Sequence, residues 1–448
     1  MPYDVLHIGV DSVDSLSGGC TTHFLFEALR EIMRRFNDKV KLLDYPILAR
    51  LNPNIPWKTR GNGAVCLRLM AQSNVISSIE ELLALMLKSY TQSYHDCDPA
   101  IAILHGELHK DFLDFYEKTL RRVVALREAL ELAQSHDVKV VKTRSGLGLI
   151  GALAAIGSLT EGDYTFEILA YRCEEETRLL DYNSVWVMEF ETWPYTFNNI
   201  DPETGRILLT PRGPDPVLYG VRGESPQVLL KASSLLKVYS KPIGYLIIRS
   251  NQGTDYHYLR VKKVREVEPY SSILLRGEVA SKPKVISGGH VVFKVSDGVE
   301  ELYCVAYKPS GDVRRASEKL EVGDEVEVYG GARRLLGLDA LSINLEKLMI
   351  LRAREKVMEM NPLCPRCRKR LKSLGRGGGY KCSRCGFKTA EATKLASRIS
   401  RKEVEGIYLP PPRSMRHLAK PFRRYGLEKK GVYELEEMKL RRVLMVGR

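Results

Sequence analysis

The sequence predicts a multidomain α+β protein, and three observations lead to this prediction. Strand-like and helix-like patterns alternate over the first half of the chain, as they do in α/β and α+β domains. A run of short strand patterns follows, and two C-x2-C motifs come after it. A chain of 448 residues has room for roughly three or four domains.

Composition and charge limit the class of protein. The longest apolar run, around Leu147 to Leu159, is too short to span a bilayer, and the N-terminus has the pattern of a strand rather than of a signal peptide. We therefore expect a cytoplasmic protein without a membrane partner. From residue 361 onward there are 24 lysines and arginines against 7 glutamates and no aspartate. This basic end predicts a polyanion partner, most often nucleic acid, although the alternative is a tail that is merely solvated.

Acidic and hydroxyl side chains follow the first predicted strand. The segment DSVDSLSGGCTT leads into an amphipathic helix pattern. Its carboxylates, Asp11 and Asp14, suit Mg²⁺, and the N–H groups of a helix that begins near Thr21 and Thr22 suit phosphate. The threonines can also simply cap the helix, which does not exclude phosphate binding. The segment therefore predicts a metal–phosphate site, although it lacks the P-loop pattern.

The stretch from Arg50 to Gly63, RLNPNIPWKTRGNG, has neither the strand period nor the helix period over most of its length. Its prolines fix φ, and its glycines and asparagines permit φ > 0, so the backbone is shaped. Arg50, Lys58 and Arg60 give this loop the means to hold an anion. The alternative is an ordinary connection whose basic residues are solvated.

The remaining elements of the first half divide into two predicted domains, 1–137 and 138–262. Strands are expected at 5–10, 39–48, 63–70, 100–104 and 138–142, and helices at 24–36, 75–90 and 111–135, followed by a tight turn and a close-packed helix within 145–157. The second domain is expected to be ferredoxin-like, with strands at 163–172, 185–190 and 245–249, a helix at 228–238 and a long functional loop at 192–215. In it, His257 is expected to be a hydrogen-bonding partner rather than a catalyst.

Five short strands predict an OB-type barrel within 270–350, a fold whose surface often binds single-stranded nucleic acid. They are expected at 273–279, 291–295, 302–307, 325–329 and 341–345. After them, Cys364, Cys367, Cys382 and Cys385 have the spacing at which four thiolates converge on a structural Zn²⁺, so 360–390 is predicted to be a zinc ribbon. The last segment, 391–448, is predicted to be a basic tail, and its proline-rich part from Tyr408 to Gly426 could be an arm that orders on RNA.

Several of these segments together resemble one known family. GVDSVDSLSGGCTT, RLNPNIPWKTRGNGA, DYTFEILAYR, GPDPVLYGVRGE and RSNQGTDYH occur in that order, followed by the barrel and the ribbon. The chain is similar over essentially its whole length to the archaeal tRNA 2-agmatinylcytidine (agmatidine) synthetases. The resemblance implies a kinase-like ATP-binding domain, a ferredoxin-like domain, an OB-fold and a zinc ribbon.

The resemblance implies an ATP-dependent ligase whose RNA partner is the isoleucine tRNA with a CAU anticodon. The enzyme would attach agmatine to the 2-position carbon of the wobble cytidine, so that the base pairs with A instead of G. A phosphoryl group of ATP would activate the 2-oxygen, the agmatine amine would displace phosphate, a threonine of the enzyme would be phosphorylated and ATP would end as AMP. The implied cofactors are ATP, Mg²⁺ and structural Zn²⁺.

The resemblance also implies residue roles. Asp11 and Asp14 are expected to hold Mg²⁺, Lys58 and Arg60 to contact the phosphates, and Thr21 (or else Thr22) to accept the phosphoryl group, while Arg50 shapes the loop. The expected cofactor-binding residues are Asn52, Asn54, Asn62 and Gly63. The agmatine cation calls for acidic residues, for which the candidates are Asp163, Glu167 and Asp215.

One position departs from the family pattern. The family usually shows DDTD after the first strand, whereas this chain has Asp11-Ser12-Val13-Asp14, which bears on the metal assignment. Two other functions remain open from the residues: a non-catalytic tRNA-binding protein, and a different ATP-dependent RNA kinase or RNA modifier. Transfer of labelled agmatine to the tRNA distinguishes the ligase from both.

Overall fold

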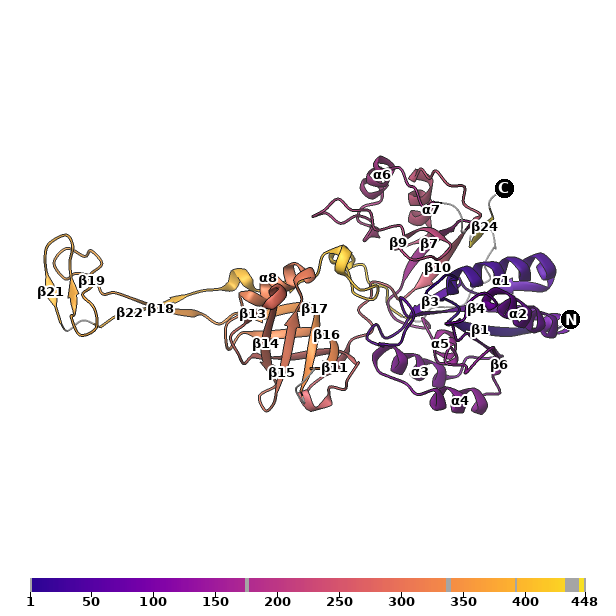
Figure 1. Ribbon diagram of the computed structural model, residues 1–448, viewed down its shortest axis with the longest axis horizontal. Coiled ribbons are helices and arrows are strands. Elements are labelled where there is room, and N and C mark those ends of the chain that lie inside the picture. Colours follow the sequence, from indigo (N-terminus) through magenta and orange to yellow (C-terminus); the bar gives the residue numbers. More distant parts are fainter. Residues whose placement is uncertain (1, 174–176, 336–339, 391–392, 432–442, 447–448) are drawn as a thin grey trace.

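The computed structural model describes residues 2–173, 177–335, 340–390, 393–431 and 443–446. An α/β body, a small β-barrel and a cysteine-containing ribbon follow one another along the longest axis of the molecule (Figure 1). Within the described residues no helix is long and apolar enough to cross a membrane.

One mixed sheet of eleven strands forms the centre of the body. From one edge to the other its main path is β6 (Lys139–Lys142), β5 (Ala100–His105), β1 (Tyr3–Asp11), β4 (Gly63–Gln72), β3 (Ile47–Arg50), β10 (Gly244–Ser250), β7 (Thr165–Tyr171), β9 (Val217–Gly223) and β8 (Thr196–Phe197). Two short strands lie off this path: β2 (Val40–Leu42) pairs with β4, and β24 (Leu444–Val446) pairs with β10.

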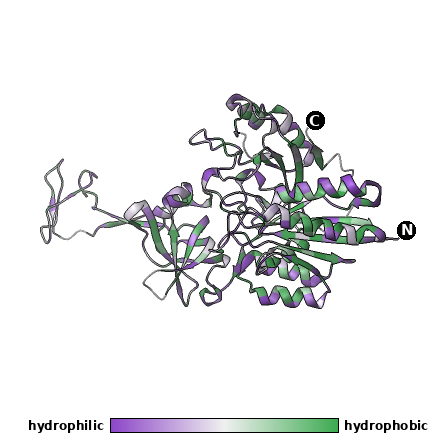
Figure 2. Ribbon diagram, turned by 45° about the vertical axis from the view of Figure 1, so that its right-hand side comes forward, coloured by the Kyte–Doolittle hydropathy of each residue, from purple (hydrophilic) through white to green (hydrophobic). Residues whose placement is uncertain are grey.

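The alternation of residues along β1 places helices on both faces of the sheet. Leu6, Ile8 and Val10 point to α1 (Thr21–Phe36) and α2 (Ile76–Thr91). On the other face lie α3 (Lys110–Arg121), α4 (Leu126–Ser135) and α5 (Leu149–Ile156). Gly9 faces α5 so closely that a Cβ there would lie 2.0 Å from the Ala152 carbonyl oxygen. Apolar residues accordingly gather on the strands and on the inner sides of the helices (Figure 2).

The two halves of the body are joined through β3 and β10, which pair in parallel at Ile47–Arg249 and Leu48–Ser250. Buried Asp44 supports this junction, because it accepts hydrogen bonds from Arg68 (2.9 Å) and from Arg249 Nε (3.2 Å). β6 lies beyond the domain boundary at residue 137 that the sequence predicted, yet it pairs with β5 of the first half.

Three predictions about the body are wrong in detail. The helix expected at 111–135 is two helices, because Arg122 is extended (φ −135°, ψ 175°) and Glu128 accepts the N–H of Ala125 to begin α4. The strand expected at 39–48 is interrupted before Pro46, which lacks an N–H for the ladder. The strand expected at 185–190 lies in a helix.

That helix is α6 (Tyr182–Thr192), and it packs against α7 (Pro226–Leu235). The Asp181 carboxylate accepts the N–H of Ser184 and so caps its first turn. Val185, Met188 and Thr192 are buried, which is the spacing of a helical face. Turns and the short strand β8 occupy the stretch from α6 to β9, where a long loop was expected.

The predicted barrel is confirmed as a closed ring of five strands. These are β12 (Ser272–Val279), β16 (Glu325–Arg334), β17 (Leu341–Arg352), β15 (Glu301–Ala306) and β14 (His290–Ser296), and pairing of β14 with β12 closes the ring. The helix α8 (Asp312–Glu318) lies between β15 and β16 in the chain. The shorter strands β11 (Leu259–Val261), β13 (Lys284–Ile286) and β23 (Gly406–Tyr408) extend the barrel sheet.

The ribbon stands away from the barrel on two antiparallel strands, β18 (Lys356–Met360) and β22 (Leu395–Ile399) (Figure 1). Its own sheet consists of β19 (Lys372–Ser373), β20 (Tyr380–Lys381) and β21 (Lys388–Thr389). The chain therefore leaves the barrel, forms the ribbon and returns.

The prediction of a free basic arm is wrong for the described part of the last segment. After β22 the chain adds β23 to the barrel and then runs into the body. Arg424 is fully buried there, and its guanidinium contacts Asp163 (2.9 Å), Glu224 and the Gly253 carbonyl oxygen (2.6 Å). The positive charge of this segment is thus partly used inside the protein. Residues 391–392, 432–442 and 447–448 of the predicted tail lie outside the described residues.

Candidate active site

A cavity of about 570 Å³ opens in the body where the two halves of the sheet meet. Separate parts of the chain line it, among them the segment after β1, the loop from Arg50 to Gly63, the stretch from Phe197 to Arg222 and the returning C-terminal segment through His417. Eight of the predicted site residues reach it from the first two parts: Asp11, Asp14, Thr21, Thr22, Lys58, Arg60, Asn62 and Gly63.

Asp11 and Asp14 lie on one wall of this cavity. Asp11 Oδ1 accepts the N–H of Ser12 at 2.6 Å, and Ser12 has a positive φ of 59°. Burial raises the pKa of Asp11 to about 8, and the Asp14 carboxylate adds to this effect. Two carboxylates that repel each other in this way fit a divalent cation, which relieves the repulsion and prefers oxygen ligands.

Thr21 and Thr22 begin α1 at the edge of the same wall. Neither caps the helix: the N-cap is Cys20, and no side-chain hydrogen bond caps the end. The Thr21 hydroxyl instead donates to Asp14 Oδ1 at 3.1 Å. The Thr22 hydroxyl lies 3.1 Å from Cys20 Sγ. Of the two threonines, Thr21 is therefore the one whose hydroxyl donates its proton to a carboxylate, that of Asp14.

Arg60 donates hydrogen bonds through Nη1 and Nη2 to acceptors of the protein, whereas its Nε is close to a carboxylate without a hydrogen bond. Its Nε lies 3.3 Å from Asp14 Oδ2, and its Nη1 lies 3.3 Å from Asp215 Oδ2. Its Nη2 donates to the carbonyl oxygens of Gly18 (2.9 Å) and Gly19. Arg60 therefore joins the acidic segment to the second half of the body.

Lys58 belongs to a group of cations at the junction of the body and the barrel. Its ammonium donates to the Ile55 carbonyl oxygen at 2.9 Å, and Arg416 donates to the Pro53 carbonyl oxygen at 3.2 Å. Burial lowers the pKa of Lys58, and the charges of Arg416 and Arg333 lower it further. The loop thus holds two cations through its own carbonyl groups.

The structure does not bring Asn52 and Asn54 to the cavity, contrary to their predicted role in cofactor binding. Both are buried, and their amides donate to the Tyr270 carbonyl oxygen (2.8 Å) and to the Ser272 hydroxyl (2.8 Å) at the start of the barrel. Asn62 and Gly63 do line the cavity, and Asn62 Nδ2 donates to the Asn52 carbonyl oxygen at 2.7 Å. The asparagines therefore shape the loop and attach it to the barrel.

Two of the three acids predicted for agmatine line the cavity. Glu167 accepts from Arg222 Nε (3.2 Å) and from Gln252 Nε2 (2.7 Å). Asp215 pairs with Arg60 and with Arg178, and burial raises its pKa although both arginines oppose that shift. Asp163 is the third acid. It lies outside the cavity lining and binds buried Arg424, which corrects its predicted contact with substrate.

Sequence reasoning missed several residues of the cavity. Asp96 and Asp98 reach it from the segment before β5, Arg222 from β9 and His417 from the C-terminal segment. Arg50 reaches it too; the loop composition had made it one of three cations for an anion, although it was then expected to shape the loop. These residues lie far apart in the chain, so no spacing pattern could have grouped them.

His257 is fully buried, and its Nε2 lies 3.5 Å from Glu346 Oε2 of the barrel, which confirms the expected hydrogen-bonding role.

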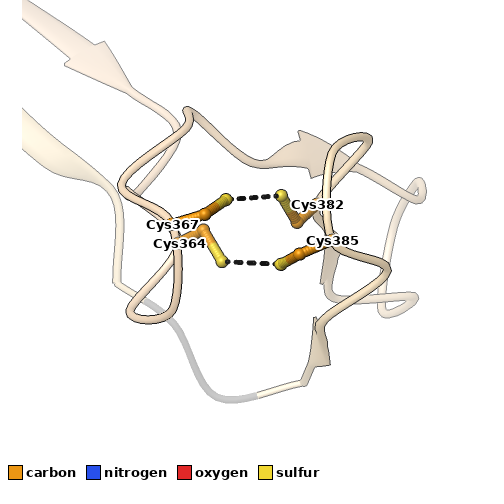
Figure 3. Close-up of side chains that lie close together, drawn as sticks. All are labelled: Cys364, Cys367, Cys382 and Cys385. Atoms are coloured by element: carbon orange, nitrogen blue, oxygen red, sulfur yellow. Dashed lines mark hydrogen bonds between the residues drawn. The ribbon is translucent and has the colours of Figure 1, made fainter.

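The four ribbon cysteines converge as their spacing predicted (Figure 3). Cys364 Sγ lies 3.5 Å from Cys385 Sγ, and Cys367 Sγ lies 3.4 Å from Cys382 Sγ. Such a set of four thiolates fits a tetrahedral structural zinc ion. The described residues contain a second group that could hold a metal, His109, Asp111 and His136 at the surface of α3 and α4.

Comparison with known proteins identifies similar chains and domains. Three family models match: the TiaS TCKD domain at residues 7–81, the TiaS FLD domain at 146–257 and the TiaS C-terminal zinc ribbon domain at 361–402. The isoleucine-tRNA 2-agmatinylcytidine synthetase TiaS of Staphylothermus marinus is 41% identical over 441 residues, covering 96% of this chain and 95% of the relative. The protein of the same name from Thermofilum pendens is 36% identical, with 94% and 95% covered.

Solved structures agree with these matches over the whole chain. A crystal structure of TiaS in complex with its isoleucine tRNA and ATP is similar with a TM-score of 0.82 and 33% identity, covering 97% of this chain and all of that one. A crystal structure of TiaS with the same tRNA, AMPCPP and agmatine is similar with a TM-score of 0.80 and 32% identity, and the match covers 96% of this chain and all of that one.

Proposed function

The chain belongs to the TiaS family of isoleucine-tRNA 2-agmatinylcytidine synthetases, and on that premise we propose that it attaches agmatine to the 2-position carbon of the wobble cytidine in the isoleucine tRNA with a CAU anticodon. The reaction consumes ATP, which ends as AMP, and gives a tRNA that decodes AUA. The observation that carries the proposal is the cavity that holds two carboxylates, a threonine hydroxyl and several cations from distant parts of the chain. We place the reaction in the cytoplasm with the tRNA.

The proposed chemistry replaces a poor leaving group by a good one. Transfer of the γ-phosphoryl group of ATP breaks its P–O bond to the β-phosphate and forms a P–O bond to the 2-oxygen of the cytosine; the second phosphoryl group that is lost when ATP ends as AMP passes to the threonine and is released from it as phosphate by hydrolysis. The primary amine of agmatine then attacks C2, a C–N bond forms, the C–O bond breaks, and the oxygen leaves as phosphate. Such transfer requires positioning and compensation of negative charge, which charged groups in an enclosed site supply.

We assign Asp11 and Asp14 to Mg²⁺, which would offset the charge of the triphosphate when bound. Ser12 offers no carboxylate, so these two residues supply the acids of this segment. Thr21 is the proposed phosphoacceptor, because its hydroxyl donates to Asp14 and Arg60 lies beside that carboxylate. Lys58, Asn62 and Gly63 complete the proposed nucleotide side of the cavity.

Agmatine is a cation at both ends, so it calls for acidic walls. Glu167 and Asp215 are the proposed partners, since both line the cavity. Arginines already bind both carboxylates, so agmatine would have to displace or share those contacts.

We propose that the tRNA approaches the cavity from the junction of body and barrel. Lys58, Arg333 and Arg416 supply positive charge there, and the exposed Trp57 ring lies 6.2 Å from that of Tyr270. Cations beside an exposed aromatic ring suit a nucleic acid strand. We further propose that the body comprises a kinase-like and a ferredoxin-like domain, that the barrel is an OB-fold and that the ribbon holds structural zinc.

The test incubates the zinc-loaded protein with a transcript of the isoleucine tRNA, Mg-ATP and labelled agmatine. Label is expected in the tRNA, and Asp11→Asn is expected to abolish transfer while tRNA affinity is kept. Asp38→Asn, a change of an exposed aspartate, is the matched control. Intact tRNA binding without transfer would favour a binding protein, and transfer of γ-phosphate alone would favour an RNA kinase.

A further inference from the structure

The positive charges of the cavity are not equivalent. Asp14 and Asp215 bind Arg60, and Asp215 also binds Arg178, so these arginines are already neutralised by carboxylates. A different group faces the cavity from β3, β9 and the C-terminal segment: Arg50, Arg222 and His417. Glu167 is the carboxylate that pairs with this group, through Arg222. Two guanidinium groups therefore share one negative charge.

Arg50 is the less engaged of the two arginines. Within the described part of the chain its side chain makes no hydrogen bond or ion pair, and its Nε is buried without a partner. Its guanidinium lies across Gly61 and Gly63, where an added Cβ would come within 2.6 and 3.1 Å of Nη1. The two glycines therefore keep open the path along which Arg50 extends into the cavity. Holding a cation unpaired in this way costs free energy, which proteins tolerate mainly at functional sites.

His417 supplies a neutral donor beside these cations. Its Nδ1 lies 3.1 Å from Arg222 Nη2, and a guanidinium can only donate, so Nδ1 accepts and the proton of the neutral ring lies on Nε2. The Arg50 charge, the desolvation of the ring and the Arg222 charge hold the pKa of His417 well below its usual value. His417 Nε2 and Arg50 Nη1 lie 3.6 and 2.6 Å from one point, the position that a Cβ on Gly61 would take. Donors from both residues thus converge beside the loop.

We propose that Arg50, Arg222 and His417 form an anion subsite that binds the oxygens of a phosphoryl group during the reaction. This inference rests on the proposed function, in which phosphoryl groups come from ATP and from the RNA. Guanidinium groups match the geometry of phosphate oxygens, and Arg50 and Arg222 carry two positive charges against the one negative charge of Glu167. The resemblance gave the phosphate contacts to Lys58 and Arg60, whereas in this proposal Arg50, the third basic residue of the loop, makes one of them.

The subsite also gives the returning C-terminal segment a part in binding. His417 is followed by Leu418, which is buried in the core of the body, and the carbonyl of His417 accepts the N–H of Gly253 at 2.8 Å. The backbone that carries the imidazole is therefore fixed to the body.

The test measures two affinities on the full-length, zinc-loaded protein: Mg-ATP without RNA, and a CAU anticodon stem–loop without ATP. Arg50→Met is expected to weaken one of them about 10- to 100-fold, the loss typical of a hydrogen-bonded charge pair. Loss of ATP affinity assigns the subsite to the triphosphate, and loss of RNA affinity assigns it to the RNA backbone. Arg260→Met, at an exposed arginine of the barrel, is the matched control.

His417 is tested by two substitutions with different geometry. Gln places its amide nitrogen near the position of Nε2, whereas Asn places it near Nδ1. If Nε2–H contacts the phosphoryl group, His417→Gln is expected to keep more affinity than His417→Asn for the same ligand that Arg50→Met affects. The proposal is overturned if Arg50→Met folds normally and leaves both affinities unchanged. Because these are binding measurements, they remain decisive even if the protein transfers no agmatine.

Discussion

Gly151 on α5 faces the carboxylate of Asp11 so closely that a Cβ at this position would lie 1.9 Å from Asp11 Oδ2. The carboxylate of Asp11 can therefore occupy this position only because residue 151 has no Cβ. Helix α5 contacts both β1 and β4, so it cannot simply shift away to make room.

Gly151→Ala is accordingly expected to abolish Mg-ATP binding as well as to destabilise the body by about 1–3 kcal/mol through overpacking. Gly9→Ala is the matched control, because a Cβ there would meet the Ala152 carbonyl oxygen across the same β1–α5 contact without touching Asp11. Calorimetric titration measures the Mg-ATP affinity of both variants at a temperature where both are folded. Equal losses of nucleotide affinity in both variants would contradict the proposed role of the carboxylate.

Arg424 is expected to hold the C-terminal segment in place. Its guanidinium is fully buried between Asp163 and Glu224, so Arg424→Met removes the cation that pairs with Asp163 and leaves Glu224 with Lys429 alone. The free energy of unfolding should fall by about 3–5 kcal/mol, as it does when one partner of a buried pair is removed. Arg423→Met, which alters a partly exposed neighbour paired with Glu189, should cost far less. Denaturant titration of the two variants measures the decrease in the free energy of unfolding that each substitution causes. Similar decreases would contradict the expected contribution of the buried Arg424 pairs to stability.

His7 is expected to make stability depend on pH. Burial lowers the pKa of His7 from 6.5 to about 4, and the Arg68 charge contributes. Between these values the unfolded chain binds the proton and the folded chain does not. The contribution of His7 to the free energy of unfolding is therefore complete above pH 6.5 and is lost as the pH falls toward 4. His7→Gln keeps a donor for the Gly106 carbonyl oxygen. This variant should lose less stability on acidification than the unaltered protein does, by on the order of 1–3 kcal/mol in the free energy of unfolding.

Denaturant titrations between about pH 7 and pH 4.5 measure this dependence. His95→Gln changes an exposed histidine and should leave the pH dependence unaltered. An unchanged profile in His7→Gln would mean that another group dominates the acid sensitivity.

Removal of zinc is expected to act on the ribbon and on tRNA modification, but not on the cavity. The ribbon lies beyond β18 and β22, far from the body along the long axis (Figure 1). Cys382→Ser should lose the metal, keep Mg-ATP affinity and lower agmatine transfer, since the ribbon belongs to the basic end of the chain for which a nucleic acid partner is predicted. Metal analysis, nucleotide titration and the transfer assay test the three parts. Cys173→Ser, at an exposed cysteine outside the ribbon, is the control. Loss of ATP affinity in Cys382→Ser would contradict the independence of the two sites.

Local patterns explain most of what the sequence predicted correctly. The barrel strands are short apolar segments separated by turns, and β14 alternates buried and half-buried residues, so each could be found within its own segment. The four cysteines are found by spacing alone, because zinc fixes the distances among its ligands. The same reasoning failed for Val185 to Phe190, where a short apolar run suits a strand or a helix and the Asp181 cap decides for the helix.

Pairing partners explain what the sequence could not predict. Asn52 and Asn54 lie in the loop that forms the cavity, but their amides turn toward the barrel. Asp163 was a plausible partner for a cationic substrate until Arg424, 261 residues away, took both of its oxygens. The charge of a residue is visible in the sequence, whereas the partner that neutralises this charge is not.

The sequence alone was enough to predict the barrel, the ribbon and its ligands, many of the body's strands and helices, and a family resemblance that pointed to Asp11, Asp14 and Thr21. Those features depend on residues that are close in the chain or on motifs of fixed spacing. The tertiary structure decided which cations of the Arg50–Gly63 loop remain unpaired. Asp14 and Asp215 pair with Arg60, whereas the Arg50 side chain, which has no ion pair within the described residues, lies beside Arg222 and His417 at the cavity. The reason is physical: charges interact through space over a few ångströms, and only folding brings residues 50, 222 and 417 within that distance.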